Sequence, residues 1–352
     1  MKGMILALSG LLLMAAAAAV QAQLLYYTNA DGSIYTYSTN ADGSATINAY
    51  SGPPWAVAIP TNINKLLVTS IGPMAFALYT NLTSVTIPNS VTNLGLNAFN
   101  GCTSLTSVMI PGGIGSIGSG AFTDCSALTN VTIANGVTSI GAVFDTGPFE
   151  GCTSLSSVTL PNSLTNIGNY AFSVCASLSN ITIPQGVTSL GIMAFRGCTG
   201  MTSITIPSCV NSIGGGAFFN STNLTSVCFT GNAPTIGSTV FYDDNNVTTY
   251  YLPGTIGWSL AFWGYPSSGP PAVLWNPLIQ ATGASFGVQS NQFGFTITNG
   301  TTNNLPIVVE ACTNLASPVW TPLQTLTLTN SFHFSDPHWT NYPARYYGLG
   351  FP

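Results

Sequence analysis

Apolar and polar residues alternate in short runs through the middle of the chain, and the same run returns at a fixed distance. Its template is Leu-x-x-Val-x-Ile-Pro-x-x-Val-x-x-Ile-Gly-x-x-Ala-Phe-x-x-Cys-x-x, which is 23 residues long. The phenylalanine recurs every 23 residues, apart from one step of 27, at Phe76, Phe99, Phe122, Phe149, Phe172, Phe195, Phe218 and Phe241. A fixed period of this length predicts a solenoid, in which successive turns stack and share one apolar interior.

Each repeat is expected to contain a strand followed by a turn. Val85 and Ile87 alternate with Ser84 and Thr86, which predicts a strand with one buried face and one wet face. Pro88 ends this strand because proline has no N–H to donate to a neighbouring strand. Stacked strands would form a parallel sheet in register. The template glycine is expected to turn the chain at positive φ, at Gly95, Gly118, Gly141, Gly168, Gly191 and Gly214.

The outward strand positions predict two rows of mostly uncharged polar side chains. One row holds Ser84, Ser107, Asn130, Ser157, Asn180, Ser203 and Ser226, and the other holds Thr86, Met109, Thr132, Thr159, Thr182, Thr205 and Cys228. Threonine is a good strand former, so a plain wet β face explains these residue types. Such rows are also able to bind an extended partner or a polysaccharide through many weak hydrogen bonds. The candidate binding residues are Ser107, Asn130, Thr132, Thr159, Asn180, Thr182 and Thr205.

The single step of 27 residues contains an insertion between Gly141 and Phe149. An insertion in one turn of a solenoid forms a loop on one face, often the binding face. Asp145 and Glu150 lie in this loop and join the candidate binding residues. Asp124 belongs to the preceding turn, so a divalent cation site is one interpretation of these carboxylates. A solvated polar loop is the simpler one, and no metal ligand is assigned.

Both ends of the chain depart from the repeat. Residues 23–66 hold two Ala-Asp-Gly turn signals between alternating runs, which predicts antiparallel strands that cap the first turn. Residues 67–266 are assigned to the solenoid and its C-terminal cap, where Trp258, Phe262 and Trp263 are suited to cover the last turn. Short alternating runs over residues 273–352 predict a small β-sandwich. The predicted fold class is therefore mainly β.

Residues 1–22 have the features of a secretory signal peptide. Lys2 supplies the positive start, an apolar run follows, and cleavage is expected near Ala22. A membrane anchor is the alternative, and no later stretch is apolar enough to span a membrane in the mature chain. Charged residues are only 4% of the 352, without the basic cluster that nucleic-acid binding requires. We expect a secreted or cell-surface monomer whose partner is an extracellular protein or a polysaccharide.

Five of the eight cysteines share one template position, three residues after the phenylalanine, at Cys102, Cys125, Cys152, Cys175 and Cys198. Stacking would align them in a column, where parallel Cβ directions fit disulfide geometry poorly. Buried thiols that pack as small apolar groups are therefore favoured over the disulfide framework that export would suggest. Cys209, Cys228 and Cys312 lie outside this column and are left unpaired.

The remaining residues that carry chemistry favour packing or loops over a site. The run HFSDPH at residues 333–338 places two histidines, a serine and an aspartate too close along one strand for catalytic geometry or a full metal ligand set. Asp243 and Asp244 are interpreted as a loop. The tryptophans lie outside the regular repeats, where cap and core packing is the first interpretation and stacking on sugar rings the second: Trp55, Trp258, Trp263, Trp275, Trp320 and Trp339. No enzyme activity and no cofactor is expected.

The repeat as printed, VTIPNSVTNLGLNAFNGC from Val85 and ITIPQGVTSLGIMAFRGC from Ile181, resembles the BspA-like, or Treponema-type, leucine-rich repeats of bacterial surface and secreted proteins. The resemblance covers about Val68 to Phe241, and residues 281–352 are similar to C-terminal modules attached to such arrays. Departures are the insertion, Ala134 for proline, and Tyr79 and Ser221 for cysteine.

The resemblance implies a curved leucine-rich-repeat solenoid, export, and binding of a protein or surface in adhesion or interaction. It carries over no catalytic residue. Carbohydrate binding by exposed aromatic residues of the caps and the C-terminal module is the alternative function.

Overall fold

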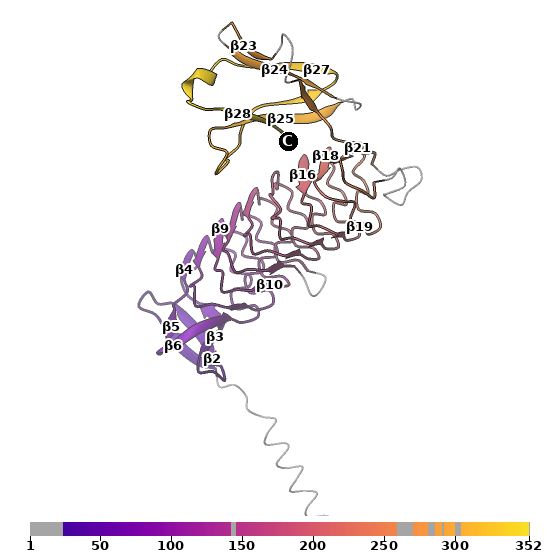
Figure 1. The fold of residues 1–352 in the computed structure, drawn as a ribbon. Helices are drawn as coiled ribbons and strands as arrows, with labels where there is room; N and C mark the ends of the chain where they lie inside the picture. The colour runs from indigo at the N-terminus through magenta and orange to yellow at the C-terminus, as the bar shows by residue number, and fades with distance from the viewer. Residues whose placement is uncertain are drawn as a thin grey trace, which may run out of the picture. The chain divides into compact units, whose positions relative to one another are not determined.

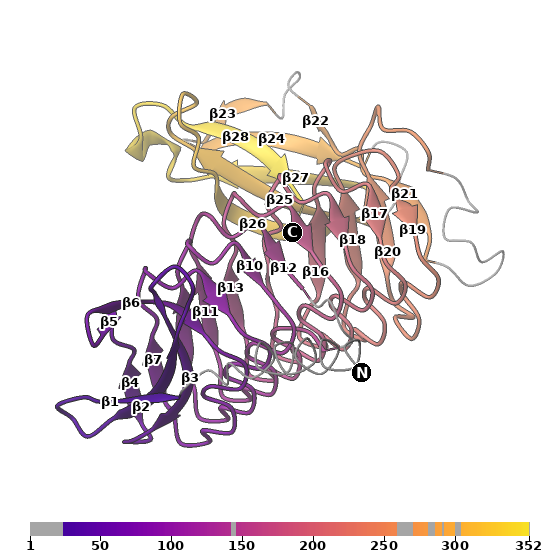
Figure 2. The ribbon, with the colours of Figure 1, turned by 90° about the horizontal axis from the view of Figure 1, so that it is seen from below.

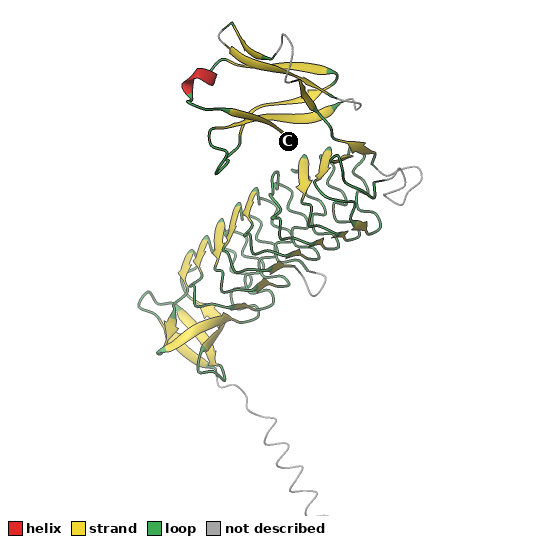
Figure 3. Ribbon diagram, viewed as in Figure 1, coloured by secondary structure: helices red, strands yellow, loops and turns green. Residues whose placement is uncertain are grey.

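The structure is a computed structural model, and it describes residues 24–141, 146–258, 270–280, 286–290, 292–299 and 304–351. The expected signal peptide at residues 1–22 lies outside these ranges, as do Phe262 and Trp263. The chain divides into two compact units, unit 1 (Met1–Ala176) and unit 2 (Ser177–Pro352). This division falls inside the predicted solenoid, and the domain boundaries given above stay predictions. The described residues are essentially all β, with one short 3₁₀ helix, η1 (Trp339–Asn341) (Figure 1, Figure 3).

Unit 1 begins with antiparallel strands, as predicted. The strand β2 (Ile34–Thr39) pairs with β1 (Leu25–Thr28) on one edge and with β3 (Ala45–Ser51) on the other. The far edge of β3 pairs in parallel with β6 (Leu66–Ile71), which also pairs with β5 (Asn62–Ile63). The ring of Tyr50 in β3 lies 5.3 Å from that of Phe76. These strands therefore cover the first phenylalanine of the array.

The stacked turns of unit 1 form two parallel ladders (Figure 2). The first ladder runs through β4 (Ala56–Ala58), β7 (Ser84–Thr86), β9 (Ser107–Ile110), β11 (Asn130–Ile133) and β13 (Ser157–Thr159). The second has two-residue strands, with β8 (Asn93–Leu94) on β6, and β10 (Ser116–Ile117), β12 (Ser139–Ile140) and β14 (Asn166–Ile167) in order. Val131 lies opposite Val108 and Val158, so the predicted parallel, in-register sheet is confirmed.

A column of phenylalanine rings fills the interior of unit 1. Phe76, Phe99, Phe122, Phe149 and Phe172 are fully buried, and neighbouring ring centroids are 4.9 to 5.6 Å apart. Their planes differ by 12° or less. Each ring is thus buried between the rings of the turns before and after it, which explains why the period is kept so strictly.

The prediction that the template glycines turn the chain at positive φ is wrong. Of the six named glycines, only Gly141 has a positive φ, at 156°. Positive φ falls instead two residues before and two residues after the phenylalanine, as at Asn97 (57°) and Gly101 (69°) around Phe99. The tight corners of each turn therefore flank the buried ring.

Close approach of the backbone requires glycine at two of the template positions, Gly95 and Gly214. A Cβ added to Gly95 would lie 2.4 Å from the carbonyl carbon of Gly72 in the preceding turn, and one on Gly214 would lie 2.5 Å from that of Gly191. Side chains cannot occupy such distances, so any other residue would push the stacked turns apart.

Gly95→Ala is expected to lower the free energy of unfolding by about 2 kcal/mol, because the added Cβ overlaps the backbone of the preceding turn and overpacking costs roughly 1–3 kcal/mol. Gly118 has the same template position, but a Cβ there would meet no atom within 4 Å. Gly118→Ala is the matched control and should stay within about 0.5 kcal/mol of the unchanged protein. Chemical denaturation followed by circular dichroism measures both, and equal losses would contradict the assignment.

Unit 2 opens with the same architecture. One parallel ladder contains β15 (Ser189–Leu190), β17 (Ser212–Ile213) and β19 (Thr235–Ile236). The other contains β16 (Ser203–Ile206), β18 (Ser226–Phe229), β20 (Thr248–Tyr251) and β21 (Ala272–Leu274). The ring of Phe218 is stacked between Phe195 at 5.6 Å and Phe241 at 5.3 Å. The ladder thus continues two strands beyond the last template phenylalanine.

Residues 180–183 have the sequence of a ladder strand but do not form one, so the prediction of a strand in this repeat is wrong. No hydrogen bond joins them to β16, which is the edge strand of its sheet in unit 2. The same two turns do pair on their other side, where Ser189 lies opposite Ser212. The local sequence allows a strand here, but no hydrogen bond to the neighbouring turn completes it.

Two antiparallel sheets form the end of unit 2. One contains β22 (Leu278–Gln280), β23 (Gly287–Gln289), β24 (Gln292–Thr298) and β27 (Ser331–Asp336), and the other contains β25 (Leu305–Cys312), β26 (Thr321–Leu328) and β28 (Tyr346–Gly350). Phe295, Ile307 and Phe334 belong to one buried core contributed by both sheets, which confirms the predicted β-sandwich. Tyr250 of β20 is part of the same core, so the sandwich packs against the end of the ladder.

The five template cysteines are buried thiols that form no disulfide, as predicted. In unit 1 each thiol donates to the carbonyl of the phenylalanine in the preceding repeat, as Cys125 does to Phe99 at 3.2 Å. Cys102, Cys152 and Cys175 make the same bond at 3.1 to 3.2 Å. Burial raises the pKa of the Cys152 thiol, which keeps the proton on this donor.

Candidate functional site

The first ladder of unit 1 presents an exposed row of uncharged polar side chains, here called the outer ladder. Its members are Ser107, Asn130, Thr132, Ser157 and Thr159, contributed by β9, β11 and β13. Asn130 lies opposite both Ser107 and Ser157, and Thr132 lies opposite Thr159. All are exposed apart from Thr132, which is half-buried. The structure therefore brings four predicted binding residues of unit 1 together on one face.

The hydroxyls of the outer ladder differ from those one residue before each strand. Thr106, Thr129 and Ser156 donate to the carbonyl of the preceding turn at 3.1 to 3.2 Å. In contrast, Ser107, Ser157 and Thr159 make no side-chain hydrogen bond to the described residues of the chain. Thr106, Thr129 and Ser156, here called the inner row, join successive turns through these hydrogen bonds. The hydroxyls of Ser107, Ser157 and Thr159 in the outer ladder remain available to a partner. Sequence reasoning missed the inner row, although a Thr or Ser before each strand was its signal.

In unit 2 the second row is covered before it reaches the last strand. Thr205 is exposed, but its neighbour Cys228 is only 1% exposed, so the prediction of an outward Cys228 is wrong. The next member of the row is Tyr250, whose ring is buried in the core of the sandwich. Burial raises the pKa of Cys228 to about 12. The free part of this face in unit 2 therefore ends at Thr205.

The acidic loop residues are only partly placed. Asp145 lies outside the described residues, and Glu150 is half-buried, with its Oε2 accepting a hydrogen bond from the Gly147 N–H at 3.1 Å. Asp124 is exposed, and its backbone N–H donates to the Glu150 carbonyl at 2.8 Å. In the part of the chain that the structure describes, no group of three or more His, Cys, Asp or Glu could hold a metal ion.

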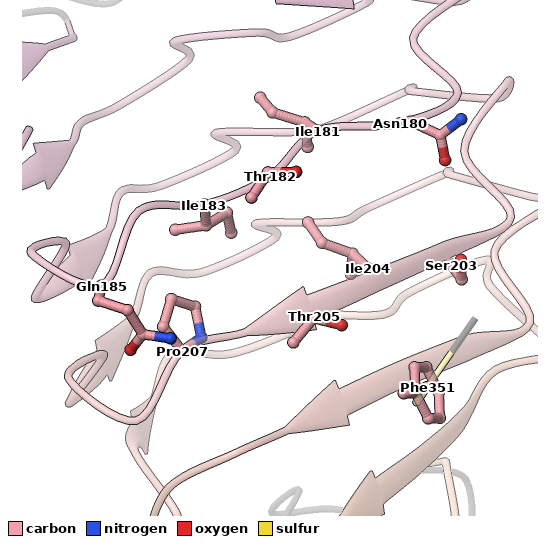
Figure 4. A pocket seen from close by; sticks show the side chains of 10 residues that line it. All are labelled: Asn180, Ile181, Thr182, Ile183, Gln185, Ser203, Ile204, Thr205, Pro207 and Phe351. Atoms are coloured by element: carbon pink, nitrogen blue, oxygen red, sulfur yellow. The ribbon is translucent and has the colours of Figure 1, made fainter. Parts of the chain in front are cut away.

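The predicted residues of unit 2 border a cavity of about 290 Å³ (Figure 4). Residues 180–183 and Gln185 line one side, residues 203–205 and Pro207 line the other, and the ring of Phe351 lies at the end. Asn180, Thr182 and Thr205 are thus brought together, and no lining side chain carries a charge. Sequence reasoning could not find this cavity, because it exists only where residues 180–183 fail to pair with β16.

Asp244 lies in a loop between β19 and β20, as predicted, but its side chain is buried. It occupies the cysteine position of its repeat and is 4% exposed, and neither of its carboxyl oxygens has a hydrogen-bond partner among the residues that the structure describes. Ser221, at the same position one repeat earlier, donates to the Phe195 carbonyl at 2.9 Å. Burial raises the pKa of Asp244 from 3.8 to about 7. The template spacing from Phe241 was the signal that could have found it.

The carboxylate in the run HFSDPH is held by an arginine that sequence reasoning did not pair with it. Asp336 Oδ2 lies 3.2 Å from Arg345 Nε, with both side chains nearly buried, and accepts the Tyr347 hydroxyl at 2.8 Å. The guanidinium also lies 4.4 Å from the ring centre of Tyr342. His333 lies apart from them, with Nδ1 3.3 Å from Thr296 Oγ1. This cluster fastens β27 to the segment that enters β28.

The described tryptophans divide into packed and exposed rings. Trp258, Trp275 and Trp339 contact other aromatic rings or donate an internal hydrogen bond, which agrees with cap and core packing. Trp55 is 64% exposed and Trp320 is 38% exposed. Only these two are open enough to stack on a sugar ring.

The sequence matches the profile of the BspA type leucine rich repeat region, in six copies over residues 57–146 and 143–257. Together these ranges span more than half of the 352 residues. No curated protein matches the sequence.

Several solved structures are similar to the chain. One is a leucine-rich-repeat protein of T. pallidum, 28% identical with a TM-score of 0.44, which covers 63% of this chain and 90% of that one. A second, from Bacteroides ovatus, is 25% identical with a TM-score of 0.37 and covers 68% of this chain and 75% of that one. A leucine-rich cell surface protein of Faecalibacterium prausnitzii is 27% identical with a TM-score of 0.34, covering 65% and 88%.

Proposed function

The chain belongs to the BspA-type leucine-rich-repeat family, and from this premise we propose that it is an exported or cell-surface protein that binds another protein or a surface without covalent chemistry. The family supports a role in protein interaction. Adhesion at the cell surface is the more specific form of that role. The outer ladder of unit 1 is its binding face, and the C-terminal sandwich is an accessory or attachment unit.

The observation that carries this proposal is an uncharged ladder on which the hydroxyls of Ser107, Ser157 and Thr159 have no hydrogen-bond partner among the described residues, while Thr132 and Asn130 bond only to each other, at 3.5 Å. Side chains that already point outward in register lose little freedom when a partner binds. Many weak hydrogen bonds from such a face favour an extended or flat partner over a small molecule. An uncharged polar face costs less to desolvate than a charged one, provided that the partner supplies hydrogen bonds to its hydroxyls and amides.

Export is supported by the sequence of residues 1–22, with a basic start, an apolar run and a cleavage signal near Ala22. In the described part of the chain, no helix is long and apolar enough to cross a membrane. Detection of mature protein beginning at Gln23 in the medium or on the cell surface, by N-terminal sequencing, is the expected result. An uncleaved chain inside the cell would contradict export.

The binding face is tested with the double substitution Thr132→Lys and Thr159→Lys. The mature protein is first screened side by side against extracellular proteins and polysaccharides, and the partner found is titrated by isothermal calorimetry. We expect the two lysines to weaken binding at least about tenfold, because a bulky, strongly hydrated charge enters an uncharged contact; tenfold corresponds to about 1.4 kcal/mol.

The matched control is Thr103→Lys with Thr153→Lys, which adds the same charge at two exposed threonines outside the outer ladder. Circular dichroism confirms that both variants fold. If a folded ladder variant and the control bind equally well, the binding face lies elsewhere.

Carbohydrate binding through exposed aromatic rings is the second candidate, and the exposure of Trp320 favours it. The apolar face of an exposed ring stacks on a sugar ring, as the edge hydroxyls remain in water. This candidate predicts retention on one of the screened polysaccharides and weaker retention of Trp320→Ala. Retention on none of them would rule against it.

A further inference from the structure

We propose that the open edge of β16 binds an extended, uncharged polypeptide segment, which joins the ladder of unit 2 as an added strand. This inference rests on the proposed function, for which it names a second contact and the form of its partner. Three observations carry it: the direction of the backbone groups of β16, the missing pairing beside it, and the alternation of the side chains around the cavity.

Backbone groups of β16 point in two directions. The carbonyls of Thr202 and Ile206 accept hydrogen bonds from Thr225 and Thr230 on the next turn, at 2.9 and 3.0 Å. Alternate residues of a strand direct their N–H and C=O groups to opposite edges. Ser203 and Thr205 therefore direct theirs to the other edge, towards residues 180–183.

Among the described residues of unit 2, no hydrogen bond meets these groups. Residues 180–183 make no hydrogen bond to β16, although the same two turns are paired in register through β15 and β17. The turns are thus held together on one side and open on the other, and the cavity of about 290 Å³ occupies the opening (Figure 4). An open edge with donors and acceptors at every second residue is a template for another strand.

Side chains around the opening show which strand would fit. Ile204 is buried, and Ser203 and Thr205 lie on the outer side, as in the closed turns. Ile181 is half-buried, whereas Val108 and Val131, at the same template position in closed turns, are 4% and 0% exposed. A strand that alternates apolar residues inward with Ser, Thr or Asn outward would bury Ile181. Since the cavity lining carries no charge, charged residues would be disfavoured.

A polypeptide suits this site better than a saccharide. Hydroxyl and amide side chains line the ladder in the closed turns as well, so they do not set the edge of β16 apart from those turns. The unpaired backbone groups do distinguish it, and they recur every two residues, the interval at which an extended peptide presents its own N–H and C=O groups. A sugar has no such repeat along its edge.

The probe is a synthetic peptide with the sequence of residues 83–88, TSVTIP, acetylated and amidated, because a ladder strand of the chain itself has the required alternation. Calorimetric titration of the full mature protein should show saturable binding. A control peptide is N-methylated on alternate residues, which removes edge donors but keeps every side chain. It should bind at least about tenfold more weakly, since each lost hydrogen bond contributes roughly 1 kcal/mol.

Two substitutions at one position separate backbone from side-chain recognition. Thr205→Pro removes the N–H that faces the opening and leaves the hydrogen bonds of β16 to β18 intact; it should abolish peptide binding. Thr205→Val removes the hydroxyl and keeps the N–H, so its affinity should stay within about twofold of the unchanged protein. If Thr205→Pro fails to fold, the N-methylated peptide and Thr205→Val still decide the question.

Residue-resolved hydrogen exchange by NMR gives an independent readout. In the free protein the amides of Ser203 and Thr205 should exchange faster than those of Asn130 and Thr132, and peptide should slow them. Equal protection in the free protein would show that residues 180–183 close the ladder, and would overturn the proposal. Loss of binding in Thr205→Val with unchanged binding of the N-methylated peptide would point to a saccharide-like ligand and overturn it as well.

Absence of peptide binding up to millimolar concentration also overturns this inference. That result leaves the proposed function intact if the binding of a protein partner is still weakened by the substitutions of Thr132 and Thr159 in the outer ladder. If that dependence is absent but the peptide binds β16, the outer ladder assignment is the one that fails.

Discussion

The midpoint of thermal unfolding is expected to fall as the pH is raised from about 4 to about 8, and Asp244 is the group responsible. Its pKa is raised to about 7 in the folded protein, chiefly by burial, with a smaller contribution from the negative charge of Asp243. In the unfolded chain the pKa is near 3.8. The folded state therefore retains a proton that the unfolded state releases over this pH range.

This contribution is fully present below about pH 4 and is lost as the pH rises through about 7. Because the pKa of Asp244 is about 7 in the folded protein and near 3.8 in the unfolded chain, the loss of stability is spread over the whole of this pH range. We expect the protonated carboxyl to donate to the Phe218 carbonyl, as Ser221 donates to the Phe195 carbonyl. Ionisation removes that donor and leaves a buried charge.

Asp244→Ser tests the assignment, because Ser221 shows that a serine hydroxyl is accommodated at this position. The variant should be more stable than the unchanged protein at pH 8 and should lose most of the pH dependence between 4 and 8. Asp243→Asn is the matched control, since Asp243 is exposed and Asn tolerates its φ of 66°. Its stability should still fall as the pH rises, with only a small change in the profile, because burial and not the Asp243 charge is the main cause of the raised pKa of Asp244. A profile of Asp244→Ser as steep as the original would contradict the assignment.

Phe122→Ala is expected to lower the free energy of unfolding by about 3–5 kcal/mol, the usual cost of removing a buried aromatic ring. The ring is fully buried and is stacked between Phe99 at 5.2 Å and Phe149 at 5.6 Å. Its removal leaves a cavity that neither neighbour can fill, because each is held by its own turn. Denaturant unfolding followed by circular dichroism measures the loss.

Met109→Ala is the control for this change. Met109 lies in β9, on the solvent-exposed face of the ladder, and is 66% exposed. Its substitution should therefore change the free energy of unfolding by no more than about 0.5 kcal/mol. A loss for Phe122→Ala no larger than that of Met109→Ala would mean that the stacked rings do not form the continuous interior described above.

The two units offer different surfaces to a partner. In unit 1 the outer ladder is open along β9, β11 and β13. In unit 2 the corresponding row is closed from Cys228 onward, because Tyr250 is buried in the sandwich core. The open edge of β16 lies just before that closure. The C-terminal module thus limits how much of the ladder in unit 2 a partner can reach.

Much of the fold could be predicted from the sequence because the spacing of residues within each repeat determines how its turns stack. The 23-residue period, the alternation at Val85 and Ile87, and the shared position of the cysteines together predicted stacked turns, a parallel ladder, and buried rings and thiols. Apolar residues that recur at one spacing must share one interior, so local pattern and packing agree. The outer ladder followed for the same reason, as the residues left on the wet face.

The sequence alone therefore determined the solenoid, its core and the row of outward side chains in the turns of unit 1. Only the tertiary structure showed that Gly95 is needed for contact between backbones, that Asp244 replaces a buried thiol, that Arg345 holds Asp336, and that residues 180–183 leave β16 unpaired. Each of these depends on the distance between groups that belong to different turns or strands. A repeat pattern specifies what each turn contains, and the spacing between two particular turns is decided by the packing of the whole unit.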